Sequence, residues 1–153
     1  MKKLLATVTL SSALLLAACG TDGTTDTVDG GLQDGTYTIE DVNFGETGWK
    51  ESLSIVVDDG EITDANWSSV NEDGDNKIED EDYQETMTNV TGTGPQDYIP
   101  ALEDGLVDAQ DPAEVEVVTG ATSTSEKFQD YAQQLVDAAE EGNTDTIEVD
   151  NQD

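Results

Sequence analysis

The chain has 153 residues, which suits one domain with appendages, and its 36 acidic against five basic residues give a formal net charge of −31 at pH 7. This charge argues against nucleic acid as a partner, because phosphates would be repelled, and equally against docking by charge on an anionic membrane. It is typical of a domain whose acidic surface faces a saline or alkaline medium.

Residues 1–18 have the layout of a secretory signal peptide. Lys2 and Lys3 precede a mainly apolar run over 4–18, which is shorter than the roughly 20 residues that a membrane-spanning helix needs. The run leads through Leu-Ala-Ala to Cys19 and resembles a bacterial lipobox. The resemblance implies that Cys19 is lipidated and becomes the new N-terminus, so that the protein is anchored in the cell membrane, facing the extracellular side, without spanning the bilayer. The alternative is an ordinary signal peptide followed by an incidental cysteine.

The segment after Cys19 is almost entirely Gly, Thr and Asp as far as residue 33. Such a composition cannot bury a core, so residues 19–33 are expected to form a flexible acidic tether that holds the folded part off the bilayer. The folded domain is expected over residues 34–143.

The first half of this domain has the pattern of an antiparallel meander with one apolar face. Residues 36–39 alternate as a first strand, residues 53–57 as a second, and residues 62–67 continue as a third with some irregularity. Asp59 and Gly60 stand between the last two, and an Asp-Gly pair predicts a hairpin turn because it tolerates positive φ.

The apolar period becomes helical in the second half. Apolar residues within 83–90 stand at helical spacing, Pro95 fits the first turn of a second helix, and a last helix is expected to end at Gly142. A short strand is expected at 115–118, and the acidic tail of residues 144–153 can return as an edge strand. Strands first and helices interleaved later favour an α+β fold, an antiparallel twisted sheet with flanking helices.

An acidic loop over residues 71–82 resembles a twelve-residue calcium loop. Oxygen-bearing side chains fall at its positions 1, 3, 5, 9 and 12, so the candidate ligands are Asn71, Asp73, Asp75, Glu79 and Asp82. Two departures stand against this interpretation: position 6 is Asn rather than Gly, and position 12 is Asp rather than the longer Glu. The alternative is a solvated acidic loop, since such matches arise by chance in a chain this acidic.

A hydroxyl-rich stretch over residues 119–125 precedes the last helix. Ser123 and Glu126 fit a capping box, with Ser123 as the N-cap. Capping does not explain Thr119-Gly120-Ala121-Thr122. The small residues Gly and Ala let a ligand or another part of the chain approach the backbone closely. A helix start also favours a phosphate, because its N–H groups are free and its dipole is positive there. Physical reasoning alone leaves both capping and anion binding open.

The same four residues resemble the [Ser/Thr]-Gly-Ala-Thr motif of the FMN-binding domain family, which includes flavin subunits of the sodium-pumping NADH:quinone reductase and of the Rnf complex. The resemblance implies that Thr122 carries FMN through a phosphoester bond, made by a dedicated transferase with FAD as donor. Thr119, Gly120, Ala121 and Ser123 would be further cofactor-binding residues.

The resemblance extends from about Asp34 to Gly142 and looks closest to single-anchor flavin lipoproteins of Gram-positive bacteria that serve extracellular electron transfer. It implies electrons from a membrane NADH dehydrogenase through quinol, and ferric iron or another external acceptor. One departure is Glu116, where many motifs of the family have Asp three residues before the first Ser or Thr.

The chain has no histidine and only one cysteine, which fits an electron-transfer flavoprotein better than an enzyme with its own substrate chemistry. The aromatic side chains could flank a flavin ring, but each is expected in the core: Tyr37, Trp49, Trp67 and Tyr98. Two alternatives stay open. One is a calcium- or cation-binding surface lipoprotein without a redox role, and the other is a non-redox adhesion module.

Overall fold

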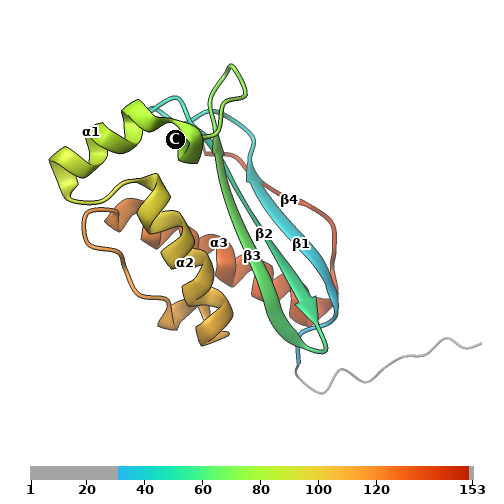
Figure 1. Ribbon diagram of the computed structural model, residues 1–153. Helices are drawn as coiled ribbons and strands as arrows, with labels where there is room; N and C mark the ends of the chain where they lie inside the picture. The colour runs from blue at the N-terminus through green and yellow to red at the C-terminus, as the bar shows by residue number, and fades with distance from the viewer. Residues whose placement is uncertain (1–30, 152–153) are drawn as a thin grey trace, which may run out of the picture.

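A four-stranded sheet in the order β3-β2-β1-β4 carries the fold (Figure 1). The structure is a computed structural model that describes residues 31–151. The expected signal peptide of residues 1–18, Cys19 and most of the tether lie outside that range. Within it, the expected α+β architecture is confirmed. None of the helices in the described range combines the length and the apolar character that a membrane crossing requires.

The strands β1 (Gly35–Asp41), β2 (Lys50–Asp58) and β3 (Glu61–Val70) form the antiparallel meander that the alternation predicts. At the β2–β3 hairpin, Asp59 and Gly60 have φ values of 53° and 78°, as a two-residue turn with the strand twist requires. The register shifts between Val56 and Val57, and this bulge explains the irregular pattern of the third strand. The strand β4 (Ile147–Val149), from the acidic tail, joins the edge of β1 in parallel.

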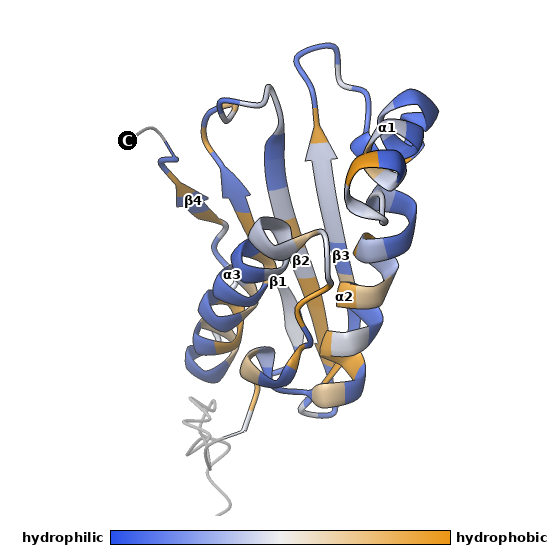
Figure 2. Cartoon of the chain, turned by 90° about the vertical axis from the view of Figure 1, so that its left-hand side faces the viewer, coloured by the Kyte–Doolittle hydropathy of each residue, from blue (hydrophilic) through white to orange (hydrophobic). Residues whose placement is uncertain are grey.

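The helices lie on one face of this sheet, in the layer that Figures 1 and 2 show from two sides. They are the 3₁₀ turn η1 (Lys77–Glu79), α1 (Glu81–Thr91), α2 (Pro95–Ala109), the 3₁₀ turn η2 (Pro112–Glu114) and α3 (Thr122–Glu141). The core lies between the sheet and the helices α2 and α3. Tyr37, Trp67 and Tyr98 are buried within it, as expected for the aromatic residues. Trp49 is also buried, at the edge of this core.

The strand expected at 115–118 does not form, because its backbone bonds go to side chains of α3. Gln129 Nε2 donates to the carbonyl of Val115 over 2.6 Å, and the N–H of Val118 donates to Ser125 Oγ over 3.0 Å. Alternation in the sequence predicts Val115 and Val117 on one buried face, but Val115 is buried in the core while Val117 is 45% exposed. The segment therefore crosses the helical layer as an extended connection without a neighbouring strand.

Candidate functional site

A tight turn over residues 118–121 leads into α3. The N–H of Ala121 donates to the carbonyl of Val118 over 2.9 Å, and Gly120 has a φ of 90°. A Cβ at Gly120 would lie 2.5 Å from the carbonyl oxygen of Thr91, at the end of α1. Glycine is therefore required twice, by the left-handed backbone and by the contact with α1. The group packed closely against Gly120 is therefore the backbone of the chain itself, at Thr91, and not a ligand.

The helix α3 begins at Thr122, not after Ser123. Ala121 is its N-cap and Ser123 its second residue, so the expected capping box of Ser123 and Glu126 is wrong. The start is shifted because Ala121 is buried in the core. Ser125 holds the turn to the helix: its buried Oγ donates to the carbonyl of Ala121 over 2.9 Å and accepts the N–H of Val118. Sequence reasoning gave Ser125 no role, since nothing in the pattern distinguishes it from its neighbouring hydroxyls.

No side chain caps the start of α3, and its first turn contains no acidic residue. Each of the other described helices and 3₁₀ turns has an acidic side chain in its first turn. The first N–H groups and the positive dipole end of α3 are thus open to water or to an external anion. Thr122 is exposed at this position, with its hydroxyl on the first residue of the helix.

A cavity of about 320 Å³ opens beside Thr122. Residues 120–124 form one wall, Tyr83 and Met87 of α1 a second, and Tyr98 of α2 a third. Burial raises the pKa of Tyr98 to about 12, so its hydroxyl stays protonated at neutral pH. The volume is at the lower end of small-molecule sites, roughly 300–1,000 Å³, which suits a ring held between aromatic and thioether walls with one edge in solvent. Of the residues expected at the site, Thr119 does not line this cavity, whereas Gly120, Ala121, Thr122 and Ser123 do.

One side chain fixes the wall that α1 contributes. Gln84 donates from Nε2 to Asp97 Oδ2 over 2.9 Å and accepts the N–H of Gln96 over 2.9 Å, both at the start of α2. Asp97 in turn accepts the N–H of Gly94 over 3.2 Å. No residue of α1 is fully buried, so these bonds contribute much of what holds the helix over the cavity.

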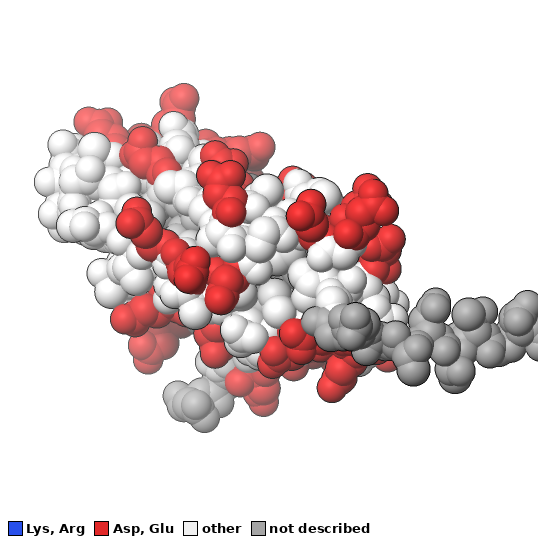
Figure 3. All heavy atoms as spheres, turned by 90° about the horizontal axis from the view of Figure 1, so that it is seen from below, with Lys and Arg blue, Asp and Glu red and all other residues white. Residues whose placement is uncertain are grey.

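The surface around the cavity is poor in charge. Within the described residues, the two longest stretches without Asp, Glu or Lys are 86–96 and 117–125. The contact of Thr91 with Gly120 brings them together. Figure 3 shows acidic side chains spread over the rest of the visible face and an uncoloured area at the end of the molecule where α1 lies in Figure 1. The stretches that flank Thr122 and face it from the end of α1 therefore bring no carboxylate of their own to an approaching anion, and Glu126, one helical turn further along α3, is the next acidic residue in the chain.

A cluster of two lysines and two carboxylates, of which Asp41 and Lys77 are buried, lies next to the cavity. The sequence gave no indication of it. Lys127 Nζ lies 2.8 Å from Asp41 Oδ2 and 2.8 Å from Glu51 Oε2. Asp41 is fully buried; it also accepts the hydroxyl of Tyr131 and the N–H of Glu51. Burial alone would lower the pKa of Lys127, but its bonds to Asp41 and Glu51 raise it. Lys77 joins the cluster through Glu51.

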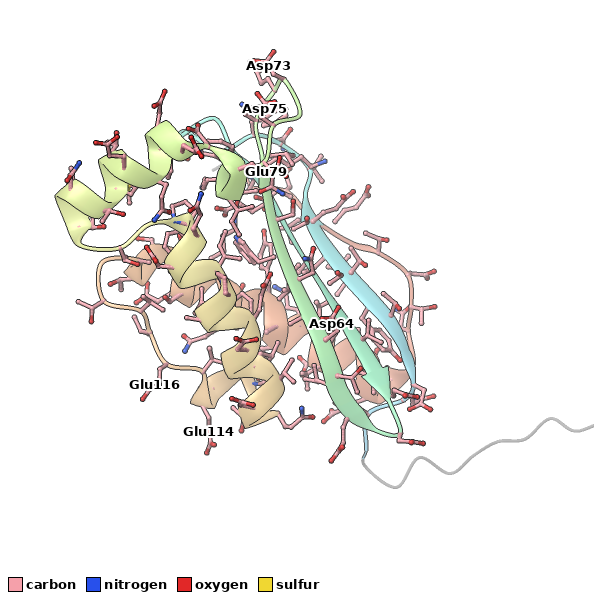
Figure 4. The ribbon with its side chains drawn as sticks, viewed as in Figure 1. Asp64, Asp73, Asp75, Glu79, Glu114 and Glu116 are labelled. Atoms are coloured by element: carbon pink, nitrogen blue, oxygen red, sulfur yellow. The ribbon has the colours of Figure 1, made fainter. Side chains whose placement is uncertain are left out.

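The acidic loop brings only some of its candidate calcium ligands together: Asn71 Nδ2 donates to Asp75 Oδ2 over 3.4 Å, and Asp75 and Glu79 line one small cavity. Asn71 Oδ1 accepts the backbone N–H groups of Asp73 and Asp75, over 3.0 Å and 2.9 Å. Figure 4 shows Asp73 at the tip of the loop, Asp75 below it and Glu79 at its base. Asp82 lies in the first turn of α1. In the described part of the chain, three carboxylates converge only at Asp34, Asp58 and Asp59, which are all exposed.

Glu116, the departure from the family motif, is exposed. Figure 4 shows Glu114 and Glu116 pointing outward from the connection between α2 and α3. Its carboxylate therefore stands on the outside of the same connection that ends at Thr122.

Comparison with known proteins places this geometry in a family. The chain matches the FMN-binding domain over residues 25–137. It is 31% identical over 138 residues to a 15 kDa lipoprotein of Treponema pallidum, covering 90% of this chain and 92% of that protein. A crystal structure of a Clostridium perfringens protein has 43% sequence identity and a TM-score of 0.75, covering 79% of this chain and 99% of that one. The chain belongs to the FMN-binding domain family.

Proposed function

We propose that the protein is a membrane-anchored flavoprotein that carries FMN covalently on Thr122. The observation that carries the proposal is the position of Thr122: its exposed hydroxyl stands on the first residue of an uncapped helix, beside a cavity with aromatic walls. Family membership supports FMN as the group, and the helix start suits its phosphate.

Different residues of the site would bind the phosphate and the ring system of this group. The first N–H groups of α3 would bind the phosphate oxygens, and Tyr83, Met87 and Tyr98 would shield the ring system from water. Attachment needs an FAD-dependent transferase: the Thr122 oxygen bonds to the phosphorus of the FMN half, the pyrophosphate bond of FAD breaks, and AMP leaves with the hydroxyl proton released to solvent or base. When bound, the flavin supplies the electron-transfer chemistry that the side chains lack.

The membrane anchor is part of the same proposal. The lipoprotein relative supports a lipidated Cys19, which would place the domain on the extracellular side. There a covalent bond has a purpose, because a dissociated flavin would diffuse away. Electrons would arrive from a membrane NADH dehydrogenase through quinol and leave to ferric iron or another external acceptor, and the acidic surface would attract cationic ferric species.

The test is covalent attachment. The full chain, produced in a host with the flavin transferase and extracted in detergent, should stay yellow after denaturation, and its intact mass should rise by one FMN less a water. Thr122→Ala should abolish the adduct and Thr122→Ser retain it, while Thr86→Ala, which changes an exposed threonine of α1 outside the motif and the cavity, is the matched control. A wild-type chain without an adduct, beside a control protein that the same transferase modifies, would refute the proposal.

The cation-binding alternative has its own measurement. No three carboxylates of the acidic loop converge in this structure, so we expect no calcium-dependent rise of the melting temperature of the flavin-loaded protein that depends on Asp75. A calcium-dependent rise that Asp75→Asn removes would instead support a cation site at residues 71–82.

A further inference from the structure

Two of the three lysines in the described part of the chain lie at one place. After Cys19 the chain has three lysines, Lys50, Lys77 and Lys127, in the company of 36 acidic residues. Lys77 and Lys127 both belong to the charge cluster, with Asp41 and Glu51 as its carboxylates. The cluster therefore has a formal charge of zero, inside a domain whose surface is strongly negative.

The two lysines of the cluster are held very differently. Lys127 has a carboxylate oxygen at 2.8 Å on each of two residues. Lys77 is 5% exposed and has one carboxylate oxygen, of Glu51, at 3.5 Å. Burial lowers the pKa of Lys77, Lys127 lowers it further, and the attraction and hydrogen bond of Glu51 do not restore it. The Lys77 ammonium is thus the incompletely neutralised charge of the cluster.

Aromatic rings take the place of a second carboxylate at Lys77. Its Nζ lies 4.9 Å from the ring centroid of Trp49 and 5.6 Å from that of Tyr83, and these two rings meet edge to face at 5.7 Å. Tyr83 also forms a wall of the cavity beside Thr122. The positive charge therefore lies one aromatic side chain away from the cavity, in a region from which water is largely excluded.

We infer that Lys77 sets the reduction potential of the flavin held in this cavity, as a positioned charge that stabilises its reduced form. The inference rests on the proposed function. Two electrons and one proton from the donor convert the oxidised ring system to a reduced form with one additional negative charge at neutral pH. The surrounding carboxylates oppose that charge, whereas a cation across one ring stabilises it. Lys77 acts through space and is a positioning residue, not a catalytic one.

The test compares charge changes of equal size on opposite faces of the sheet. Lys77→Met and Lys50→Met each remove one positive charge, but Lys50 neighbours Glu51 on β2 and so points to the face away from the cluster. For the flavin-loaded full chain, we expect Lys77→Met to lower the equilibrium constant for two-electron reduction at least tenfold, a shift of about −30 mV. Lys50→Met should change the equilibrium constant much less, and Lys77→Arg, which keeps the positive charge, should have the wild-type value.

A second variant tests the sign independently. Glu51→Gln removes a negative charge from the same cluster, so it should raise the equilibrium constant where Lys77→Met lowers it. Dye-equilibrated flavin absorbance gives the potentials, and intact mass gives the FMN content of each variant. Equal potentials for the flavin-loaded Lys77→Met, Glu51→Gln and Lys50→Met proteins would overturn the inference and leave the proposed function standing. A wild-type chain without flavin would overturn both.

Discussion

Gly120 has two reasons to be glycine, its left-handed backbone and its close contact with Thr91, and replacing it by alanine tests both. The left-handed backbone costs a non-glycine residue about 1–2 kcal/mol, which is partly offset by about 0.4–1 kcal/mol from a less flexible unfolded chain. The added Cβ would also lie 2.5 Å from the carbonyl oxygen of Thr91, a backbone atom that cannot rotate away. Overpacking of this kind costs about 1–3 kcal/mol. We therefore expect Gly120→Ala to lower the free energy of unfolding by about 2–4 kcal/mol.

Gly74 provides the matched control, because it shares the backbone conformation and lacks the contact. Its φ is 87° against 90° for Gly120, and a Cβ there would meet nothing within 4 Å. Gly74→Ala should therefore cost about 1 kcal/mol, the backbone contribution alone. Urea unfolding followed by the fluorescence of Trp49 and Trp67 measures both variants.

The same pair of variants connects stability with the site. Relief of the clash must move the turn or the end of α1, and both form walls of the cavity. Gly120→Ala should therefore also lower the fraction of chains that acquire FMN on Thr122, while Gly74→Ala should leave it unchanged. If the two variants lose equal stability, the contact of Gly120 with Thr91 has no energetic role and the reasoning fails.

Two further substitutions test other parts of the structure. Ser125→Ala leaves the N–H of Val118 without its partner, so it should cost about 1–3 kcal/mol in urea unfolding and reduce FMN attachment, whereas the exposed Ser123→Ala should change stability little. Burial raises the pKa of Glu103, and Asp64 and Asp104 raise it further against the opposing bond from the N–H of Trp67. The folded state then holds more protons than the unfolded state above the ordinary glutamate pKa, so stability falls as the pH rises through this window. Glu103→Gln keeps an acceptor for Trp67 and should remove that fall, which makes it more stable than the wild type at about pH 7 and not at about pH 4; an equal difference at both pH values would contradict the assignment.

The sequence predicts those elements whose signals are local. The meander follows from alternation and from the Asp59-Gly60 pair, and the ends of the helices follow from Pro95 and Gly142. The strand at 115–118 was wrong on two counts: the alternation predicts a common buried face for Val115 and Val117, of which only Val115 is buried, and it says nothing about what pairs with the backbone. Here side chains of α3 take the place of a neighbouring strand.

The site divides in the same way between local and distant determinants. Thr122 could be selected from a motif, because its neighbours in the chain are its neighbours in space. The start of α3 could not be placed, because it depends on whether Ala121 or Ser123 reaches the core. The walls from Tyr83 and Tyr98 and the cation at Lys77 come from other elements, so no spacing in the sequence associates them with Thr122.

The point where the tether joins the folded domain determines how close the flavin site of an anchored protein can come to the membrane. Gln33 is bound to the C-terminal end of α3, since its N–H donates to the carbonyl of Ala139 over 2.9 Å. Thr122 is at the other end of this 20-residue helix, about 30 Å away at 1.5 Å per residue. Residues 20–32 could span at most about 45 Å when fully extended. That reach exceeds the length of α3, so a lipid on Cys19 would allow either end of the helix to face the bilayer. A shorter tether would hold the flavin site away from a membrane donor, and shortening residues 20–32 should therefore slow reduction by quinol before it affects oxidation by a soluble acceptor.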